Sequence, residues 1–237
     1  MSKHTSEALE SGYALSHRIY ELSGIAATAL TGAWLCARLS SAGPMPLWWF
    51  PVALVLGMVG ADLVSGVVHW GFDTFGDVDT PVVGKLAIRT FRHHHVDPTA
   101  MLKHDFIETN GHNVTLSLVL TTTGLWLVPS AGAASRGALF GAVCMVTMAI
   151  FVSITSQIHK WAHMASPPRL VRRLQRMRVI LSPDHHDRHH AAPHRENYCI
   201  ALGWLDGTLR RTRIFEHTER LIQAITGVAP QHSEPDA

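Results

Sequence analysis

The most unusual feature of this sequence is its histidine content, because 17 of its 237 residues are histidine and most of them stand in tight groups. His159 and His163 are four residues apart, a spacing that places two imidazoles on one face of a helix about one turn apart. A helix through His186, His189 and His190 would likewise bring three imidazoles to one face. The sequence therefore predicts two chelating sets for a metal.

Two more groups of histidines lie earlier in the chain. His69 stands where an apolar stretch ends, and His94 and His95 follow His93 in a run of three. A single histidine at such a position is more often a packing or surface residue than a ligand. Several groups of imidazoles that meet at one face repel one another when protonated, however, and shared metal ions remove that repulsion. The joint pattern therefore favours metal binding.

The types and number of the ligands favour two iron ions. Imidazole binds zinc, copper, iron and nickel, but Cys36, Cys144 and Cys199 form no CxxC pair, which argues against structural zinc and iron–sulfur clusters. The HExxH motif of zinc proteases is absent from the sequence. Eight or more histidines exceed what one ion can bind. Two irons held mostly by imidazole can activate oxygen to remove hydrogen from an unactivated C–H bond, the hard step on a lipid chain.

Two aspartates accompany His69. Asp62 is the one ionisable side chain deep in an apolar stretch, and a buried charge in a membrane is costly enough to be treated as functional by default. It precedes His69 by two helical turns, about 10 Å, so support of the ligands or helix packing suits it better than shared ligation. Asp73 follows His69 by four residues and could either orient that imidazole or cap a helix or turn.

The elements that must position these side chains are membrane helices. With 47% hydrophobic residues, the chain is too apolar for an ordinary soluble domain of its size. Four apolar stretches approach the roughly 20 residues that cross a bilayer: Leu22–Leu39, Leu47–Val68, Val114–Ala133 and Ala138–Ile158. We therefore expect an all-α membrane protein with four transmembrane helices and a cytoplasmic, histidine-rich, metal-binding cap.

This reading divides the chain into three parts: an N-terminal cytoplasmic segment (1–21), a four-helix membrane domain (22–227) and a flexible C-terminal tail (228–237). Of the 20 Lys and Arg residues, 18 fall in the N-terminal, middle and C-terminal polar segments, so positive charge lies on one face. By the positive-inside rule both termini are cytoplasmic. The expected location is a bacterial inner membrane or the endoplasmic reticulum, and a net charge of +2 makes nucleic acid an unexpected partner.

Four segments of the sequence together resemble the plasmanylethanolamine desaturase family, also called Kua. They are Asp62–Gly76, Phe91–Asn113, Gln157–His163 and His185–Trp204. The resemblance implies a di-iron centre that uses O2 to introduce the vinyl-ether double bond, which turns a plasmanyl ether phospholipid into a plasmenyl one. It also implies an external electron donor, such as a cytochrome b5-like or ferredoxin-like protein.

The resemblance further implies which residues bind iron. The matched ligand positions are His69, His94, His95, His159, His163, His186, His189 and His190. A second tier of metal-binding or supporting residues comprises His104, His185 and His194, with Asp73 and Asp62. Two positions depart from the family, which usually has Glu in place of His93 and Asp in place of His112. We expect neither of those histidines to be a ligand. No catalytic residue beyond the ligands and no substrate-binding residue is assigned.

Alternative functions stay open at this point. The family signature extends to a plant group that desaturates the acyl chains of phosphatidylglycerol, and the segment 197–200 is similar to the version in that group, whereas Phe91–Asn113 is closer to the ether-lipid group. Desaturation or hydroxylation of phospholipid acyl chains is therefore the main alternative. A non-catalytic metal-binding membrane protein is less favoured, because a scaffold has little use for chelating pairs at helical spacing.

Overall fold

The computed structural model of the protein describes residues 15–129 and 134–231, and every regular element within these ranges is helical. Parts of both expected terminal segments, 1–14 and 232–237, lie outside the described residues, as does the link 130–133. The expectation of an all-α protein is confirmed for the part of the chain that the structure describes.

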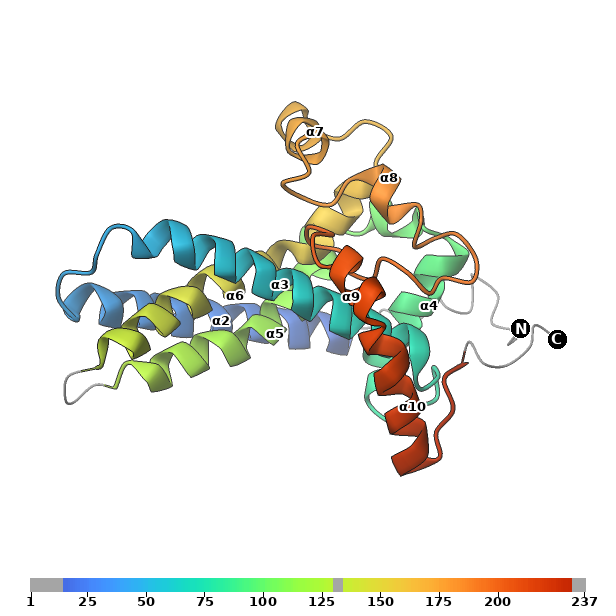
Figure 1. The fold of residues 1–237 in the computed structure, drawn as a ribbon, viewed down its shortest axis with the longest axis horizontal. Helices are drawn as coiled ribbons and strands as arrows, with labels where there is room; N and C mark the ends of the chain where they lie inside the picture. The colour runs from blue at the N-terminus through green and yellow to red at the C-terminus, as the bar shows by residue number, and fades with distance from the viewer. Residues whose placement is uncertain (1–14, 130–133, 232–237) are drawn as a thin grey trace.

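Four long helices run side by side and form the body of the molecule (Figure 1). They are α2 (Leu15–Ser41), α3 (Trp49–Thr74), α5 (Phe106–Leu127) and α6 (Arg136–Ala162). Helix α5 packs between α2 and α6, and α3 packs against α6. Among the described residues, three helices are long and apolar enough to cross a membrane, namely α2, α3 and α6.

The helices extend beyond the apolar stretches that marked them in the sequence. Helix α2 begins at Leu15 rather than near Leu22, because its polar first turns pack on the start of α5, where Arg18 forms an ion pair with Asp105 at 2.7 Å. Helix α5 begins at Phe106, well before its apolar stretch, because the Asp105 carboxylate accepts hydrogen bonds from the backbone N–H groups of the first turn. The apolar stretches therefore mark the middle of these helices rather than their ends.

Hydroxyl side chains link the four helices. Thr28 donates from α2 to the carbonyl of Val114 in α5 at 2.8 Å, and Thr147 donates from α6 to the carbonyl of Ala53 in α3 at 2.8 Å. Ser117 of α5 bonds to the carbonyl of Ala149 in α6 at 3.1 Å. Small polar residues that bond to a neighbouring backbone are typical of packed membrane helices, because they allow close approach and satisfy their own hydroxyls.

Short helices gather at one end of the bundle (Figure 1). They are η1 (Gly84–Ile88), α4 (Arg89–Val96), η2 (Ala100–Lys103), α7 (Arg169–Arg176), α8 (Pro183–His186), α9 (Asp206–Thr212) and α10 (Ile214–Thr226). The expected helix through His186, His189 and His190 is wrong beyond its first residue. Helix α8 ends at His186, and the next two histidines lie in a turn whose N–H groups both point to the His186 carbonyl, at 2.9 and 3.3 Å. Pro193 limits any longer helix, because it lacks an N–H and biases the residue before it toward extended backbone.

Candidate metal centre

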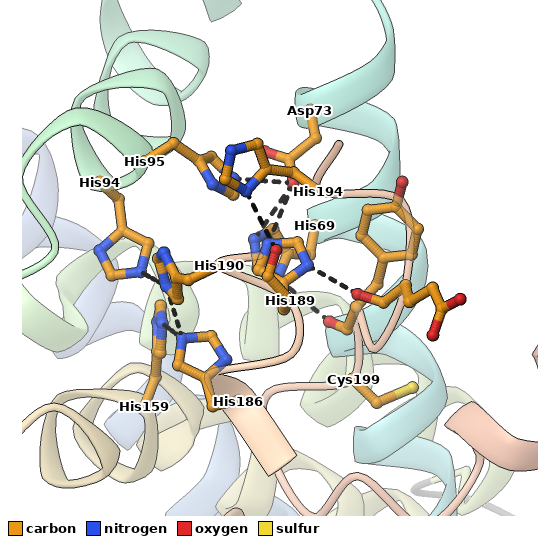
Figure 2. A network of polar contacts seen from close by, with 12 residues as sticks. His69, Asp73, His94, His95, His159, His186, His189, His190, His194 and Cys199 are labelled. Atoms are coloured by element: carbon orange, nitrogen blue, oxygen red, sulfur yellow. Dashed lines mark hydrogen bonds and ion pairs between the residues drawn. The ribbon is translucent and has the colours of Figure 1, made fainter. Parts of the chain in front are cut away.

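Eight histidines and one aspartate meet at the end of the bundle in two groups, and Figure 2 labels all of them except His163. Cluster A consists of His94, His159, His163, His186 and His190. Cluster B consists of His69, Asp73, His95 and His189. Within each cluster the potential ligand atoms all lie within 4.8 Å of one another. The structure thus brings together all eight histidines that the sequence singled out as ligands, in two sets.

Neighbouring histidines in the sequence belong to different clusters. His94 and His95 are consecutive on α4, and because successive helical residues point about 100° apart, the first ring joins cluster A and the second joins cluster B. His189 and His190 divide in the same way in the turn after α8. The centroids of these two rings are 5.5 Å apart, so the clusters are immediate neighbours. This differs from the expectation that His186, His189 and His190 form one set.

The nitrogen atoms of cluster A are spaced as ligands of one ion would be. The Nε2 atom of His186 lies 2.7, 2.9 and 3.0 Å from the Nε2 atoms of His159, His163 and His190. His94 completes the group, with its Nε2 3.0 Å from His190 and 3.1 Å from His163. Imidazole nitrogens bind metal ions such as zinc at about 2.1 Å, so two of them at right angles are about 3.0 Å apart. The donor set therefore fits a single transition-metal ion.

The surroundings of four imidazoles of cluster A favour the neutral form, which is the form that binds a metal. Burial lowers the pKa of His94 and of His186 well below the ordinary value, and neighbouring imidazoles lower it further. Burial likewise lowers the pKa of His163 to about 4 and that of His190 to about 3. Five converging Nε2 atoms cannot all be satisfied by protons shared among themselves, because each neutral ring carries only one N–H. A metal ion would satisfy all of them at once.

Two backbone carbonyls fix the rings of cluster B. His69 Nδ1 donates to the carbonyl of Tyr198 at 3.1 Å, and His189 Nδ1 donates to the carbonyl of Glu196 at 2.8 Å. With the proton held on Nδ1, the lone pair of each ring lies on Nε2. Among the described residues, neither Nε2 atom has a hydrogen-bond partner, although both rings are fully buried. Buried nitrogens without a partner are costly, and a metal ion would satisfy them.

Asp73 supplies the one carboxylate of cluster B. Its Oδ2 atom lies 3.1 Å from Nε2 of His95 and 3.4 Å from Nε2 of both His69 and His189. The sequence suggested that Asp73 either orients His69 or caps a helix or turn. The nitrogen that an orienting group would hold is already bonded to Tyr198, so Asp73 faces the lone-pair side of the rings instead. Neither orienting carbonyl carries a signal in the sequence, because both belong to the backbone.

The histidines of the second tier lie outside both clusters. His194 is next to cluster B, where its Nδ1 donates to the His189 carbonyl at 3.1 Å and its ring centroid is 4.7 Å from that of His95. His185 Nε2 lies 2.7 Å from Asp206, whose other oxygen accepts from the backbone of Cys199. The ring of His104 lies 3.5 Å from the Glu108 carboxylate. Each of these three rings thus contacts a backbone carbonyl or a carboxylate.

Asp62 holds the loop that carries one of the orienting carbonyls. Its carboxylate accepts hydrogen bonds from the backbone N–H groups of Leu202, Gly203 and Leu205, at 2.7, 2.9 and 3.0 Å. One turn later on α3, Ser65 Oγ accepts from the N–H of Ile200 at 3.1 Å. The chain from residue 198 to residue 205 is thereby fastened along α3 beside His69. The sequence suggested either support of the ligands or helix packing for Asp62, and these hydrogen bonds join it to the loop that carries the Tyr198 carbonyl.

Replacing Asp62 with alanine is expected to destabilise the fold, because it leaves three buried or partly buried N–H groups unpaired, at about 1–3 kcal/mol each. The melting temperature should fall by about 6 °C or more. Ser65→Ala is the matched control, since it removes one such bond in the same contact and should cost about a third as much. Thermal unfolding in detergent measures both variants. Equal melting temperatures for the two variants would contradict this role of Asp62.

His93 and His112, the departures from the family pattern, lie outside both clusters. His93 is buried in α4 and lines a cavity with His94, whereas His112 lies in α5 with its Nδ1 3.1 Å from the buried Glu21 carboxylate. We therefore expect His93→Glu and His112→Asp to keep bound iron and most activity, with losses smaller than those of His94→Ala or His95→Ala.

Iron content and turnover of the four variants test this expectation. His112→Asp places a second carboxylate against Glu21, so it should lose stability but not metal, and the double variant His112→Asp/Glu21→Gln should recover that stability. If His93→Glu or His112→Asp loses iron as completely as His94→Ala, the chain uses ligands beyond the two clusters.

One cavity reaches the metal centre from outside. It is lined by α4, η2, α5 and α6, and both His94 and His159 of cluster A form part of its wall. Phe91, Met101 and Ile200 give it an apolar surface. The wall of the cavity is therefore partly apolar, which suits the approach of a hydrocarbon chain to cluster A.

A family model for the lipid desaturase domain matches residues 58–233, a range that contains both clusters. The chain belongs to this lipid desaturase family. It is 41% identical over 228 residues to the plasmanylethanolamine desaturase of Myxococcus xanthus, a match that covers 96% of this chain and 80% of that protein. It is 43% identical over 182 residues to plasmanylethanolamine desaturase 1 of Mus musculus, covering 76% of this chain and 67% of that protein.

The chain is also similar to a protein that is named for another activity. The chain is 37% identical over 184 residues to the chloroplastic fatty acid desaturase 4 of Arabidopsis thaliana, which covers 76% of this chain and 54% of that protein. No solved structure matches the chain. The resemblance found in the histidine-bearing segments is therefore confirmed at the level of the family, with ether-lipid and fatty-acid desaturases both among the relatives.

Proposed function

We propose that the protein is an O2-dependent di-iron lipid desaturase that forms the vinyl-ether bond of plasmenyl lipids from plasmanyl ether phospholipids. The observation that carries this proposal is the pair of adjacent histidine clusters in a chain that is 41% identical, over 96% of its length, to a plasmanylethanolamine desaturase. Eight imidazoles and a single carboxylate form a nitrogen-rich donor set, which suits iron and leaves little role for structural zinc.

Each of the two clusters would hold one metal ion. The five imidazoles of cluster A would hold one iron, and the three imidazoles of cluster B with Asp73 would hold the other. Two irons bound there would activate O2, the oxidant that removes two hydrogens from adjacent carbons of the lipid chain. The overall reaction consumes one O2, two electrons and two protons and releases two waters, so it requires an external donor that delivers two electrons per turnover. A cytochrome b5-like or ferredoxin-like protein is the class of donor we propose.

The protein's own contribution is orientation and exclusion of water. The carbonyls of Tyr198 and Glu196 keep the rings of His69 and His189 turned with Nε2 toward the centre. His69, His186 and His189 are almost entirely buried, so water has little access to the donor atoms from their side. The cavity lined by Phe91, Met101 and Ile200 is where we place the lipid chain next to cluster A.

We also propose a topology for the enzyme. Helix α5 crosses the membrane with α2, α3 and α6, because it packs between α2 and α6 within the same bundle. The histidine-bearing end faces the cytoplasm of a bacterial cell or the cytoplasmic side of the endoplasmic reticulum, since the Lys and Arg residues concentrate there. Residues 22–227 then form the membrane domain, and both termini lie on the cytoplasmic side.

The product distinguishes the proposed activity from its main alternative, which is desaturation of a phospholipid acyl chain as the name of the Arabidopsis relative suggests. Vinyl ethers hydrolyse in mild acid and release a fatty aldehyde, whereas an alkene within an acyl chain does not. Cells that express the protein and are fed an alkyl-ether precursor should therefore yield aldehyde on acid treatment, and cells with His163→Ala should not. A new acyl double bond without aldehyde would favour the alternative substrate.

A further inference from the structure

Two short helices beside the bundle, α7 and α10, each have three faces: one packed on the protein, one apolar and exposed, and one polar and exposed. Helix α7 packs on the protein through Val171 and Gln175, which are buried. Leu170 and Met177, by contrast, are 68% and 61% exposed. Because successive residues turn by about 100°, Leu170 and Met177 fall in one stripe with the half-buried Leu174. The rest of its exposed surface is basic and consists of Arg169, Arg172, Arg173 and Arg176.

Helix α10 repeats this arrangement. It is fixed to the end of α3 by Trp70, which donates to the buried Glu219 at 2.9 Å and stacks on Phe215 with ring centroids 4.8 Å apart. Leu221 and Ile225 are 58% and 75% exposed and share a helix face with the exposed Ile214. Polar residues such as Gln223 occupy the side opposite that stripe.

Both helices project from the histidine-bearing end of the bundle. In Figure 1 they stand on opposite sides of it, and α10 runs across the long direction of the four main helices. A helix in that position beside a membrane-spanning bundle meets three media, namely protein, hydrocarbon and water. The three faces of α7 and of α10 match these three media, whereas a helix surrounded by water on its outer side needs only two kinds of face.

We propose that α7 and α10 lie in the membrane surface, with their apolar stripes among the lipid chains and the arginines of α7 on anionic phospholipid headgroups. The α7 arginines match the negative charge of such a surface, and each basic residue near it contributes to binding. The two helices brace the bundle from opposite sides and fix the depth of clusters A and B relative to the headgroups. The proposal concerns the membrane-facing surface and does not depend on which lipid is desaturated.

Nitroxide labels on the full-length protein in lipid nanodiscs test the position of the stripes. The background replaces Cys36 and Cys144 with serine and retains Cys199, which is fully buried. Leu170→Cys and Leu221→Cys place the label in the stripes, and Arg172→Cys and Gln223→Cys place it on the opposite side of the same helices.

Labels in the stripes should collide more with oxygen, which concentrates in lipid, and the control labels more with a water-soluble nickel chelate. Equal exposure of stripe and control labels to nickel would overturn the proposal. Protection of the stripes from both reagents would also overturn it, because another protein or a second copy of the chain would then cover them.

The charge of α7 is tested by lipid binding. Arg172→Gln/Arg173→Gln should weaken the enrichment of phosphatidylglycerol over phosphatidylcholine around the purified protein by about fivefold for each arginine. The matched control, Arg188→Gln/Arg211→Gln, removes two exposed arginines from outside α7 and should leave the enrichment unchanged. Mass spectrometry of the bound lipids measures it, and unchanged iron content shows that the variants are folded. An equal loss in both double variants would mean that α7 has no special role.

Discussion

Purified protein is expected to contain about two irons per chain, and His163→Ala and His189→Ala should each remove about one of them from a different cluster. His163 belongs to cluster A, where its Nε2 lies 3.1 Å from that of His94, and His189 belongs to cluster B, where its Nε2 faces Asp73 at 3.4 Å. Because the proposed reaction needs both irons, each variant should lose desaturase activity almost completely. The loss of metal affinity should exceed the roughly 100-fold effect of removing a supporting group alone.

Iron per chain and vinyl-ether formation, measured on the same samples, test this result. His104→Ala is the matched control, because His104 lines the same cavity as His94 and His159 but belongs to neither cluster, and the variant should keep both irons. Full iron occupancy and turnover in His163→Ala or His189→Ala would show that the replaced residue is not a ligand. Loss of both irons in each variant would show that the clusters do not bind metal independently.

Many residues of the metal centre could be predicted from the sequence, because the spacing of ligands along a helix is a local property. Two histidines four residues apart, such as His159 and His163, approach each other once their segment is helical, whatever the rest of the fold does. The division of the ligands between cluster A and cluster B could not be predicted from the sequence. It depends on the direction in which the His94–His95 and His189–His190 pairs point, and that is set by how α4 and the turn after α8 pack at the end of the bundle.

The supporting contacts were harder still to predict. The carbonyls of Tyr198 and Glu196 leave no trace in the sequence, because every residue has a carbonyl. Asp62 was conspicuous as a charge in an apolar stretch, but its partners lie about 140 residues further along the chain and could not be named. Likewise, the apolar stretches located the long helices, but the starts of α2 and α5 depend on polar contacts such as the Asp105 cap.

Asp73→Asn is expected to release the iron of cluster B and leave that of cluster A. The Asp73 carboxylate faces the Nε2 atoms of three histidines, and it provides the one negative charge among the four ligand side chains of the cluster. Asparagine has nearly the same shape but is neutral, so it binds a cationic metal less well. We expect a loss of affinity of more than about 100-fold and a loss of activity as severe as that of His189→Ala.

The iron content of Asp73→Asn distinguishes a carboxylate that binds the metal from one that only orients an imidazole. If the carboxylate only held an imidazole in place, asparagine could still accept a hydrogen bond through its amide oxygen, and most of the iron would survive dialysis against a chelator. A ligand that supplies charge predicts the opposite, and Asp73→Glu should then retain more iron than Asp73→Asn because it keeps the carboxylate. Asp77→Asn is the control, since Asp77 is a nearby exposed carboxylate that caps a turn through the N–H of Asp79. Retention of two irons in Asp73→Asn would exclude Asp73 from the ligands and leave cluster B with three imidazoles.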